Sequence, residues 1–328
     1  MSSAKKVLTT IAAVFGVLLI AAGAAAYVYG PTMTAMFTGT AKFMGTDTPK
    51  RYASTVLDLA EQGIYADSPE FAEASDKARE AAKQADSLDE IRPALNDAVQ
   101  AAGGKHSKLI DPNVEQEYAE MESTRAAVER NGNVAWATVP GVSRHDDIQS
   151  YADTLTSGLV QARDNGACGV VVDLRGNDGG DMGPMVAGLS PVLPDGTVLE
   201  FVSAGGSSPV TVSGNAVSGG GSPVETSGGK WDGVPVAVLV DDLTASSGEA
   251  TMLAFRGLDQ SRSFGTPTAG YASANTVYDF PDGSSLMLTI AKDKARTGET
   301  FAEDPIEPDV QGGQEQALQW LRDEHNCS

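Results

Sequence analysis

Residues Val236–Glu249 have the sequence VAVLVDDLTASSGE, an apolar run followed by a polar turn and a serine. The apolar run predicts a buried β-strand, and Ser246 lies where the next helix would begin. Backbone N–H groups converge at a helix N-terminus, and the helix dipole favours negative charge there. Ser246 is therefore a candidate nucleophile. Ser246 and Glu249 also fit the S-x-x-E capping box of ordinary helices, and taken alone this segment favours the capping role.

A second polar loop follows the other strongly apolar strand. Residues 168–174 (CGVVVDL) predict a buried strand, and the loop Asp173–Gly180 has the sequence DLRGNDGG. Helices are expected at 146–163 and 182–189, and alternating strands and helices indicate βαβ units. Ligands of open α/β sheets bind beyond the carboxyl ends of the strands, so both loops are expected to line one crevice. Gly179 and Gly180 could present bare backbone N–H groups to an oxyanion.

The N-terminal part divides into segments of different character. Residues 1–6 form a short tip with Lys5 and Lys6, and 7–29 carry no charge. As a helix, 7–29 would span about 34 Å, enough to cross a bilayer, and the lysines predict that the N-terminus stays inside. This predicts a single-pass membrane anchor with an extracytoplasmic main body, although the small residues at 21–26 leave a cleaved signal open.

Two further segments complete the predicted organisation. Residues 30–110 are expected to form a helical subdomain, because helix start signals at Thr48-Pro49, Ser68-Pro69 and Ser87 precede helical patterns. Pro93 lies inside the third pattern and is expected to kink that helix or delay its start. Residues 111–328 form the α/β core, in which 196–230 suggest hairpins and further strands are expected at 274–280 and 285–291.

Composition excludes some classes of function. The formal net charge of −21 argues against a nucleic-acid partner, which would need a basic face. The sequence has no metal-ligand spacing and no phosphate-binding fingerprint, so we expect no metal and no cofactor. Cys168 and Cys327 either form one disulfide or remain a buried residue and a tail thiol. The oligomeric state is not predicted.

A nucleophilic serine needs a base, and the chain has three histidines. His145 lies in a charged stretch and His325 lies in the tail. His106 lies in the segment GGKHS, immediately after the third predicted helix. A histidine on a loop is most often only solvated, so His106 needs further support as a candidate base.

Four segments in one order give that support. VVVDLRGNDGG, VPVAVLVDDLTASSGEATMLAFRGL, FGTPTAGYASANTVYDFPDGSSLMLT and IEPDV resemble the tail-specific, or carboxyl-terminal processing, family of serine peptidases. The resemblance covers roughly 133–321 and implies an α/β core of the ClpP/crotonase-like type. It implies that Ser246 is the nucleophile, and that Ser247 N–H and a glycine of the 177–180 turn form the oxyanion hole.

The sequence departs from that family at one position. Bacterial tail-specific members have a lysine after PT-x-G, whereas this chain has Tyr271. A phenol is a poor base near neutral pH. The chain is more similar to the tricorn-core branch, which uses a histidine, and His106 is the matching position. Lys105 replaces a serine that precedes this histidine in the branch, although Ser107 lies next to it.

The same branch carries a carboxylate near its terminal PD motif. Glu303 and Asp304 both match this position, and the sequence does not separate them. The short separation between His106 and the strand at 133–141 leaves no room for a peptide-binding PDZ module. The expected function is thus a membrane-anchored serine peptidase acting on proteins or peptides. The alternative is a non-catalytic module of the same fold that binds an apolar ligand or a peptide.

Overall fold

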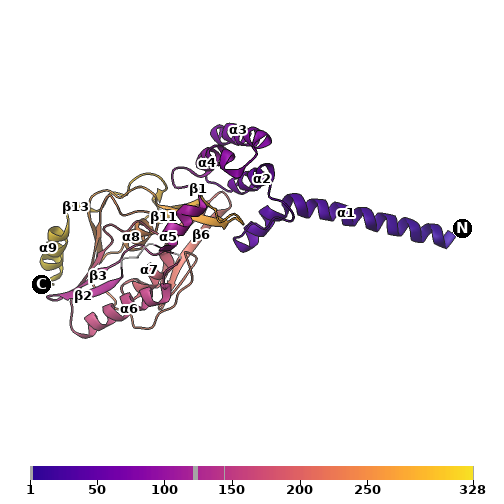
Figure 1. The fold of residues 1–328 in the computed structure, drawn as a ribbon. Helices are drawn as coiled ribbons and strands as arrows, with labels where there is room; N and C mark the ends of the chain where they lie inside the picture. Colours follow the sequence, from indigo (N-terminus) through magenta and orange to yellow (C-terminus); the bar gives the residue numbers. More distant parts are fainter. Residues whose placement is uncertain (1–2, 121–124, 144, 328) are drawn as a thin grey trace. The chain divides into compact units, whose positions relative to one another are not determined.

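The computed structural model describes residues 3–120, 125–143 and 145–327 (Figure 1). It consists of two compact units. The first contains residues 1–116 and 275–289, and the second contains 117–274 and 290–328. The first unit is therefore built from two separate stretches of sequence.

The first unit begins with a long helix, α1 (Ser3–Thr38), drawn in indigo in Figure 1. Residues Thr10–Thr38 are long and apolar enough to cross a membrane, which agrees with the predicted span at 7–29. Arg51 contacts α1 at Tyr27, within the C-terminal half of the helix. Its guanidinium lies 3.7 Å from the centre of the Tyr27 ring and donates a hydrogen bond to the Tyr27 carbonyl. A cation over an aromatic face is attracted by the ring's negative π-face.

Three helices follow, as the start signals predict: α2 (Pro49–Ala60), α3 (Pro69–Gln84) and α4 (Leu88–Gly103). Thr48 and Ser68 cap α2 and α3 through their side chains. Pro93 lies inside α4, which nevertheless starts at Leu88. The expected delay is therefore wrong: α4 begins directly after Ser87 and continues through Pro93, at the cost of the one backbone hydrogen bond that proline cannot donate. Apolar side chains such as Val56, Ile91 and Leu95 are fully buried in this unit.

Strands complete the first unit. Strand β1 (Lys108–Ile110) follows α4 and pairs antiparallel with the start of β11 (Ser285–Ala295). Strand β10 (Ser273–Asp279) precedes β11, and α5 (Pro112–Glu120) follows β1. The segment 275–289 thus returns to the N-terminal helices and brings strand residues next to the loop that carries His106.

The second unit is built on a sheet with the strand order β13-β9-β8-β4-β3-β2. Its strands are β2 (Ala127–Asn131), β3 (Val134–Thr138), β4 (Gly169–Asp173), β8 (Val236–Val240), β9 (Ser261–Gly265) and β13 (Val310–Gln311). Strands β3, β4, β8, β9 and β13 run parallel, and β2 is the antiparallel edge. The predicted βαβ organisation is therefore present.

Helices cover both faces of this sheet (Figure 1). Helices α6 (Ile148–Asp164), α7 (Met182–Gly188) and α8 (Ser247–Phe255) pack on one face, which buries Val170, Val172 and Val238. Helix α9 (Gln314–His325) packs on the other, where Trp320 and Leu321 contact the face formed by Val171, Ala237 and Leu239. Burial on both faces explains the continuous apolar runs of β4 and β8.

A set of antiparallel strands extends the second unit. The order β5 (Gly196–Ser203), β6 (Gly206–Ser213) and β7 (Ala216–Ser218) forms a meander in the Gly- and Ser-rich region where hairpins are expected. The end of β11 pairs with β5 and with β12 (Thr300–Phe301). A short 3₁₀ helix (Ser190–Val192) precedes this region.

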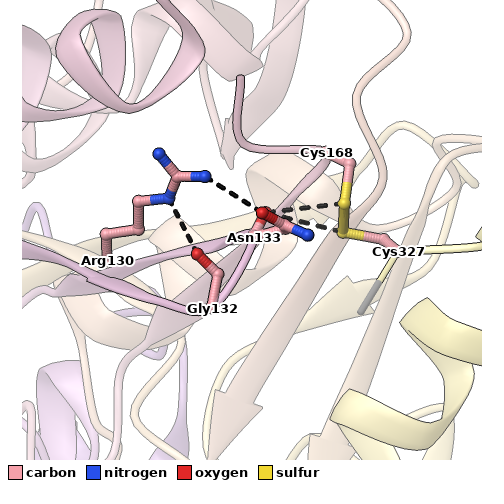
Figure 2. The surroundings of a disulfide bond; sticks show 5 residues. All are labelled: Arg130, Gly132, Asn133, Cys168 and Cys327. Carbon is pink, nitrogen blue, oxygen red and sulfur yellow. Dashed lines mark hydrogen bonds between the residues drawn. A yellow bond between two sulfur atoms is a disulfide. The ribbon is translucent and has the colours of Figure 1, made fainter. Parts of the chain in front are cut away.

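A disulfide joins Cys168, just before β4, to Cys327, just after α9 (Figure 2). The two Cα atoms are 5.4 Å apart, which is within the usual range for such a bond. Arg130 donates hydrogen bonds to Gly132 and Asn133 beside it. The structure thus selects the disulfide from the two states that the sequence left open.

Candidate active site

The two polar loops meet at the carboxyl ends of the neighbouring strands β4 and β8. Ala245 N–H donates to the Asn177 carbonyl (2.8 Å), and Gly176 N–H donates to Asp241 Oδ1 (3.0 Å). The Thr244 hydroxyl donates to the Leu174 carbonyl from the opposite loop (2.9 Å). The two loops are therefore adjacent, as their positions after β4 and β8 predict, and direct hydrogen bonds join them.

Ser246 has an unusual backbone conformation at this junction. Its φ is 53° and its ψ is −119°, a region that residues with a side chain rarely adopt. Within the described chain it shares a positive φ with one other non-glycine residue, Asn326. Such a conformation persists only where the surroundings enforce it, and it is concentrated at functional sites. The turn places a serine at the start of α8 at the cost of backbone strain.

Glu249 holds this strained turn in place. One carboxylate oxygen accepts from Ser246 N–H (2.9 Å) and Tyr271 N–H (2.7 Å). The other accepts from Gly270 N–H (2.9 Å) and from the Thr268 hydroxyl. Burial raises the pKa of Glu249, and these four donors oppose the rise because they favour the charged form. Glu249 thereby ties the start of α8 to the loop 268–271.

The capping-box interpretation holds for only one of the two partners. Glu249 accepts from Ser246 N–H, as such a box requires. The Ser246 hydroxyl, in contrast, makes no capping hydrogen bond to the helix. Since the hydroxyl is not used for capping, it is available for chemistry.

The backbone donors around Ser246 are not equivalent. Gly179 N–H already donates to Asn177 Oδ1 (2.9 Å). Among the backbone hydrogen bonds of the described residues, neither Gly180 N–H nor Ser247 N–H has an acceptor. The Ser247 hydroxyl donates to the Gly180 carbonyl (2.6 Å) and keeps these two residues together. Of the two predicted glycines, Gly180 is the one with an N–H to offer an oxyanion.

Gly179 has a different role, because the absence of a side chain at this position leaves space for the Ser246 side chain. Its φ is +109°, and a Cβ atom there would lie 2.7 Å from Ser246 Cβ and 3.1 Å from Ser246 Oγ. A side chain at this position would therefore collide with the candidate nucleophile. The requirement for glycine arises from both the backbone conformation and the close approach.

Asn177 is a buried residue to which sequence reasoning assigned no role. Its Nδ2 donates to the Val139 carbonyl (2.8 Å), its Oδ1 accepts from Gly179 N–H, and its carbonyl accepts from Ala245 N–H. Asn177 thus connects the residue that follows β3, the glycine turn and the serine loop. Its place inside the GNDGG motif was the available signal, but the motif does not show which way the amide points.

Asp293 is a second residue that sequence reasoning missed. It lies on β11, is 1% exposed, and its Oδ1 has no hydrogen-bond partner among the described atoms. Burial, together with the nearby charge of Glu249, raises its pKa well above the ordinary value. A neutral carboxyl group beside the charged Glu249 is the expected state, because two adjacent buried carboxylates repel each other.

His106 belongs to the first unit, in the turn between α4 and β1. Its Nε2 lies 3.0 Å from Asn275 Nδ2. Burial lowers the pKa of His106 to about 4, and the charges of Lys108 and Lys105 act in the same direction. The imidazole is therefore neutral at neutral pH, which is the protonation state that a general base needs. Its role toward Ser246 remains a prediction.

The other predicted side chains have distinct environments. The backbone of Glu303–Pro305 lies against Gly270, where a Cβ atom would be 2.7 Å from the Glu303 carbonyl oxygen. Glu303 is half-buried and Asp304 is exposed. His145 is exposed, and His325 packs edge-on against Trp320 at 4.5 Å. The latter two histidines are thus accounted for as surface and packing residues.

The sequence of the chain is similar to those of known proteins. Residues 140–311 match the model of peptidase family S41. The nisin-resistance protein of Lactococcus lactis is 36% identical over 280 residues, which cover 84% of this chain and 87% of that protein. The carboxy-terminal processing protease CtpA of Bacillus subtilis is 28% identical over 168 residues, or 50% of this chain and 33% of that protein.

Solved structures give a similar result. A lipoprotein from Streptococcus agalactiae has a TM-score of 0.76 at 27% identity, and the match covers 86% of this chain and 99% of that chain. The photosystem II D1 C-terminal processing protease has a TM-score of 0.57 at 14% identity, with coverage of 82% and 94%. The second likeness concerns the fold alone. These matches confirm the predicted α/β fold.

Proposed function

This chain belongs to peptidase family S41, and from that membership we propose that it is a membrane-anchored serine peptidase whose nucleophile is Ser246. The observation that supports the proposal most directly is the strained turn at Ser246, whose hydroxyl makes no capping hydrogen bond. A strained backbone that presents a serine beside unoccupied N–H groups is suited to acyl transfer.

We propose the following sequence of steps. His106 accepts the Ser246 proton, and the serine oxygen attacks the carbonyl carbon of a peptide bond. Gly180 N–H and Ser247 N–H stabilise the negative oxygen of the tetrahedral intermediate. The protonated His106 then donates its proton to the nitrogen of the leaving amine as the C–N bond breaks, which leaves an acyl-enzyme. Water then releases the acid by the reverse proton transfers. Loss of one oxyanion donor typically lowers the rate about 10²–10³-fold.

Either Glu303 or Asp304 is proposed as the acidic member of the site. The partial burial of Glu303, and the contact of its backbone with Gly270, favour Glu303 over the exposed Asp304. Glu303→Gln should therefore lower kcat more than Asp304→Asn. Equal activity of both variants to the wild type would remove the acidic member from the proposal.

The N-terminal helix supports the proposed location. A span at Thr10–Thr38 fits a single membrane anchor, with Lys5 and Lys6 on the inner side and both units outside. The disulfide agrees with this orientation, because such bonds persist outside the reducing cytosol. Protein or peptide substrates would then be met at the outer surface.

The experiment that tests the proposal is labelling with a fluorophosphonate, a probe that reacts covalently with activated serines. The full chain in detergent micelles would be compared with Ser246→Ala and His106→Ala. His145→Ala is the matched control, since His145 is an exposed histidine of the other unit. We expect labelling of the wild type and the control, and its loss in the other two. Absence of labelling in folded wild type would contradict the proposal.

A second candidate function is binding without cleavage. It is favoured by the name of the Lactococcus lactis relative, which refers to resistance to nisin and not to proteolysis. Nisin incubated with the full chain, followed by mass spectrometry, separates the two functions. Fragments that are absent with Ser246→Ala would support the peptidase. Intact nisin that co-purifies with both wild type and Ser246→Ala would support binding.

A further inference from the structure

We propose that Asn275 is a positioning residue that fixes the ring orientation and the tautomer of His106, and that Thr289 fixes Asn275 in turn. This inference rests on the proposed function of His106 as a base. It assigns a role to an amide in β10 that lies far from His106 in the sequence. All of the residues involved belong to the first unit.

A chain of hydrogen bonds supports this role. Asn275 Nδ2 lies 3.0 Å from His106 Nε2, and Asn275 Oδ1 accepts from the Thr289 hydroxyl at 2.8 Å. Thr289 N–H donates to the hydroxyl of Ser107 at 2.9 Å, next to His106 in sequence. Thr289 and Ser107 are both almost completely buried. The amide is therefore held from behind by a strand, and it contacts the ring from a fixed direction.

The hydrogen-bonding groups of Asn275 and Thr289 determine which nitrogen of the neutral His106 ring carries the proton. An amide N–H₂ facing Nε2 requires a lone pair on Nε2, so the proton of the neutral ring lies on Nδ1. If the amide rotates by half a turn, Oδ1 faces Nε2 and places the proton there, which leaves the Nδ1 lone pair to accept the serine proton. The Thr289 hydroxyl can donate or accept, so it satisfies the amide in both orientations. The proposal requires the rotated amide, in which Asn275 Oδ1 accepts from Nε2–H and Asn275 Nδ2 donates to the Thr289 hydroxyl. In that orientation Nδ1 carries no proton and is the proposed base.

Asn275 orients the ring without adding charge. The neutral Asn275 of β10 contacts His106 Nε2, and the neutral Thr289 of β11 contacts Asn275 in turn. The charges of Lys105 and Lys108, on the same segment as His106, lower the pKa of His106. An aspartate in place of Asn275 would put a negative charge at the same atom. An opposite charge within about 4 to 6 Å typically raises a histidine pKa by about 1 to 3.

The first test measures the pKa of His106 directly. In the full chain in detergent micelles, the exchange rate of the imidazole C2 hydrogen is followed against pH by mass spectrometry of peptides. We expect Asn275→Asp to raise the pKa of His106 by about 1 to 3. Asn96→Asp is the matched control, because it adds the same charge in the first unit, where Asn96 accepts from Leu109 N–H. The control should leave the pKa of His106 nearly unchanged. Equal pKa values in Asn275→Asp and wild type would overturn the proposal.

The second test measures catalysis. The acid limb of kcat/KM should move upward in Asn275→Asp by the same amount as the pKa of His106. Asn275→Leu, which keeps the volume but has no hydrogen bonds, should lower kcat about a hundredfold with little change in KM. Thr289→Val should lower kcat, whereas Thr289→Ser should restore it. Wild-type kcat in both Asn275→Leu and Thr289→Val would overturn the positioning role.

The two tests separate the inference from the function on which it rests. An unlabelled, inactive wild type defeats the proposed function, even if Asn275→Asp raises the pKa of His106. An active wild type whose His106 pKa and pH profile do not respond to Asn275→Asp defeats the inference alone.

Discussion

At the scale of single residues, the candidate site depends on an absent side chain and an absent capping hydrogen bond as much as on the hydrogen bonds that are formed. Gly179 has no side chain where one would reach Ser246, and the Ser246 hydroxyl makes no capping bond. Glu249 restrains the turn, since it accepts from Ser246 N–H and from three donors of the loop 268–271. A small change at these positions should therefore affect the reaction before it affects the fold.

Gly179→Ala tests this directly. The added methyl group would lie within 3.1 Å of Ser246 Oγ and should displace this proposed nucleophile. We expect kcat to fall about 10²-fold, which is typical of a reacting group displaced by about 1 Å. Gly196→Ala is the control, because Gly196 has a similar φ of +116° but open space around it. Fluorophosphonate labelling rates of the two variants give the comparison, and equal rates would contradict the steric role.

Asp293 gives a prediction of pH-dependent stability. Its pKa is raised in the folded state, so the folded chain keeps a proton that the unfolded chain releases above pH of about 4. The stability associated with this group is complete at low pH and declines as the pH rises toward the folded pKa. In Asp293→Asn the group does not titrate. The stability of the variant relative to wild type should therefore increase by about 1.4 kcal/mol per pH unit in that interval.

Denaturant unfolding of both proteins at several pH values between 4 and 7 measures this difference. Asp304→Asn is a suitable comparison, because Asp304 is exposed. A pH-independent difference between Asp293→Asn and wild type would mean that Asp293 is ionised in the fold.

For individual residues, the sequence motifs predicted which loops lie together, but they did not predict the hydrogen bonds of individual side chains. The meeting of Ser246 with the glycine turn followed from the rule that loops at the carboxyl ends of parallel strands converge. The contacts of Asn177, Asp293 and Asn275 did not follow from any motif, because they depend on side-chain directions and on partners distant in sequence.

At the scale of elements, the apolar strands and the capped helices were predictable from local patterns. Strand β9, with the sequence SRSFG, was missed because polar residues interrupt it. It is a strand because its backbone pairs in parallel with β8, so tertiary context overrides its weak propensity. Strand β11 extends four residues beyond its predicted end at 291, since pairing with β5 and β12 continues it.

Helix α9 is held by packing and by the disulfide together. Ala317, Trp320 and Leu321 bury its inner face, and Cys327 is bonded to Cys168 across 159 residues. Replacing both cysteines by alanine should lower stability by about 2 to 4 kcal/mol. Peptidase activity at 25 °C should remain, because neither cysteine belongs to the proposed site. Thermal unfolding with and without reductant checks the prediction: reductant should lower the midpoint of wild type only. An effect of reductant on the variant as well would contradict it.

At the scale of the whole molecule, the net charge should influence which peptides bind. The net charge of −21 produces a negative field around the protein, which should attract basic peptides and repel acidic ones. We expect kcat/KM for a peptide with several lysines to fall about tenfold between 0.05 M and 0.5 M salt, because ions screen this attraction. A neutral peptide of the same length should change little. An equal response of the two peptides would mean that charge does not guide binding.

The division into two units marks the limit of prediction from sequence. Local patterns placed the helical segment and the α/β core, and the family resemblance singled out His106. No local pattern shows that residues 275–289 return to the N-terminal unit, and therefore that Asn275 lies beside His106. This pairing is separated by 169 positions along the chain, and only the folded structure reveals it.

The redox state of Cys168 and Cys327 can report on which side of the membrane the second unit folded. A thiol pair that stays in the cytosol is kept reduced, whereas one that has crossed the membrane is oxidised. Alkylation of free thiols in intact cells before electrophoresis would preserve the redox state of the two cysteines. The fraction of chains that resist alkylation would then report the orientation of the protein in the membrane, without any added tag.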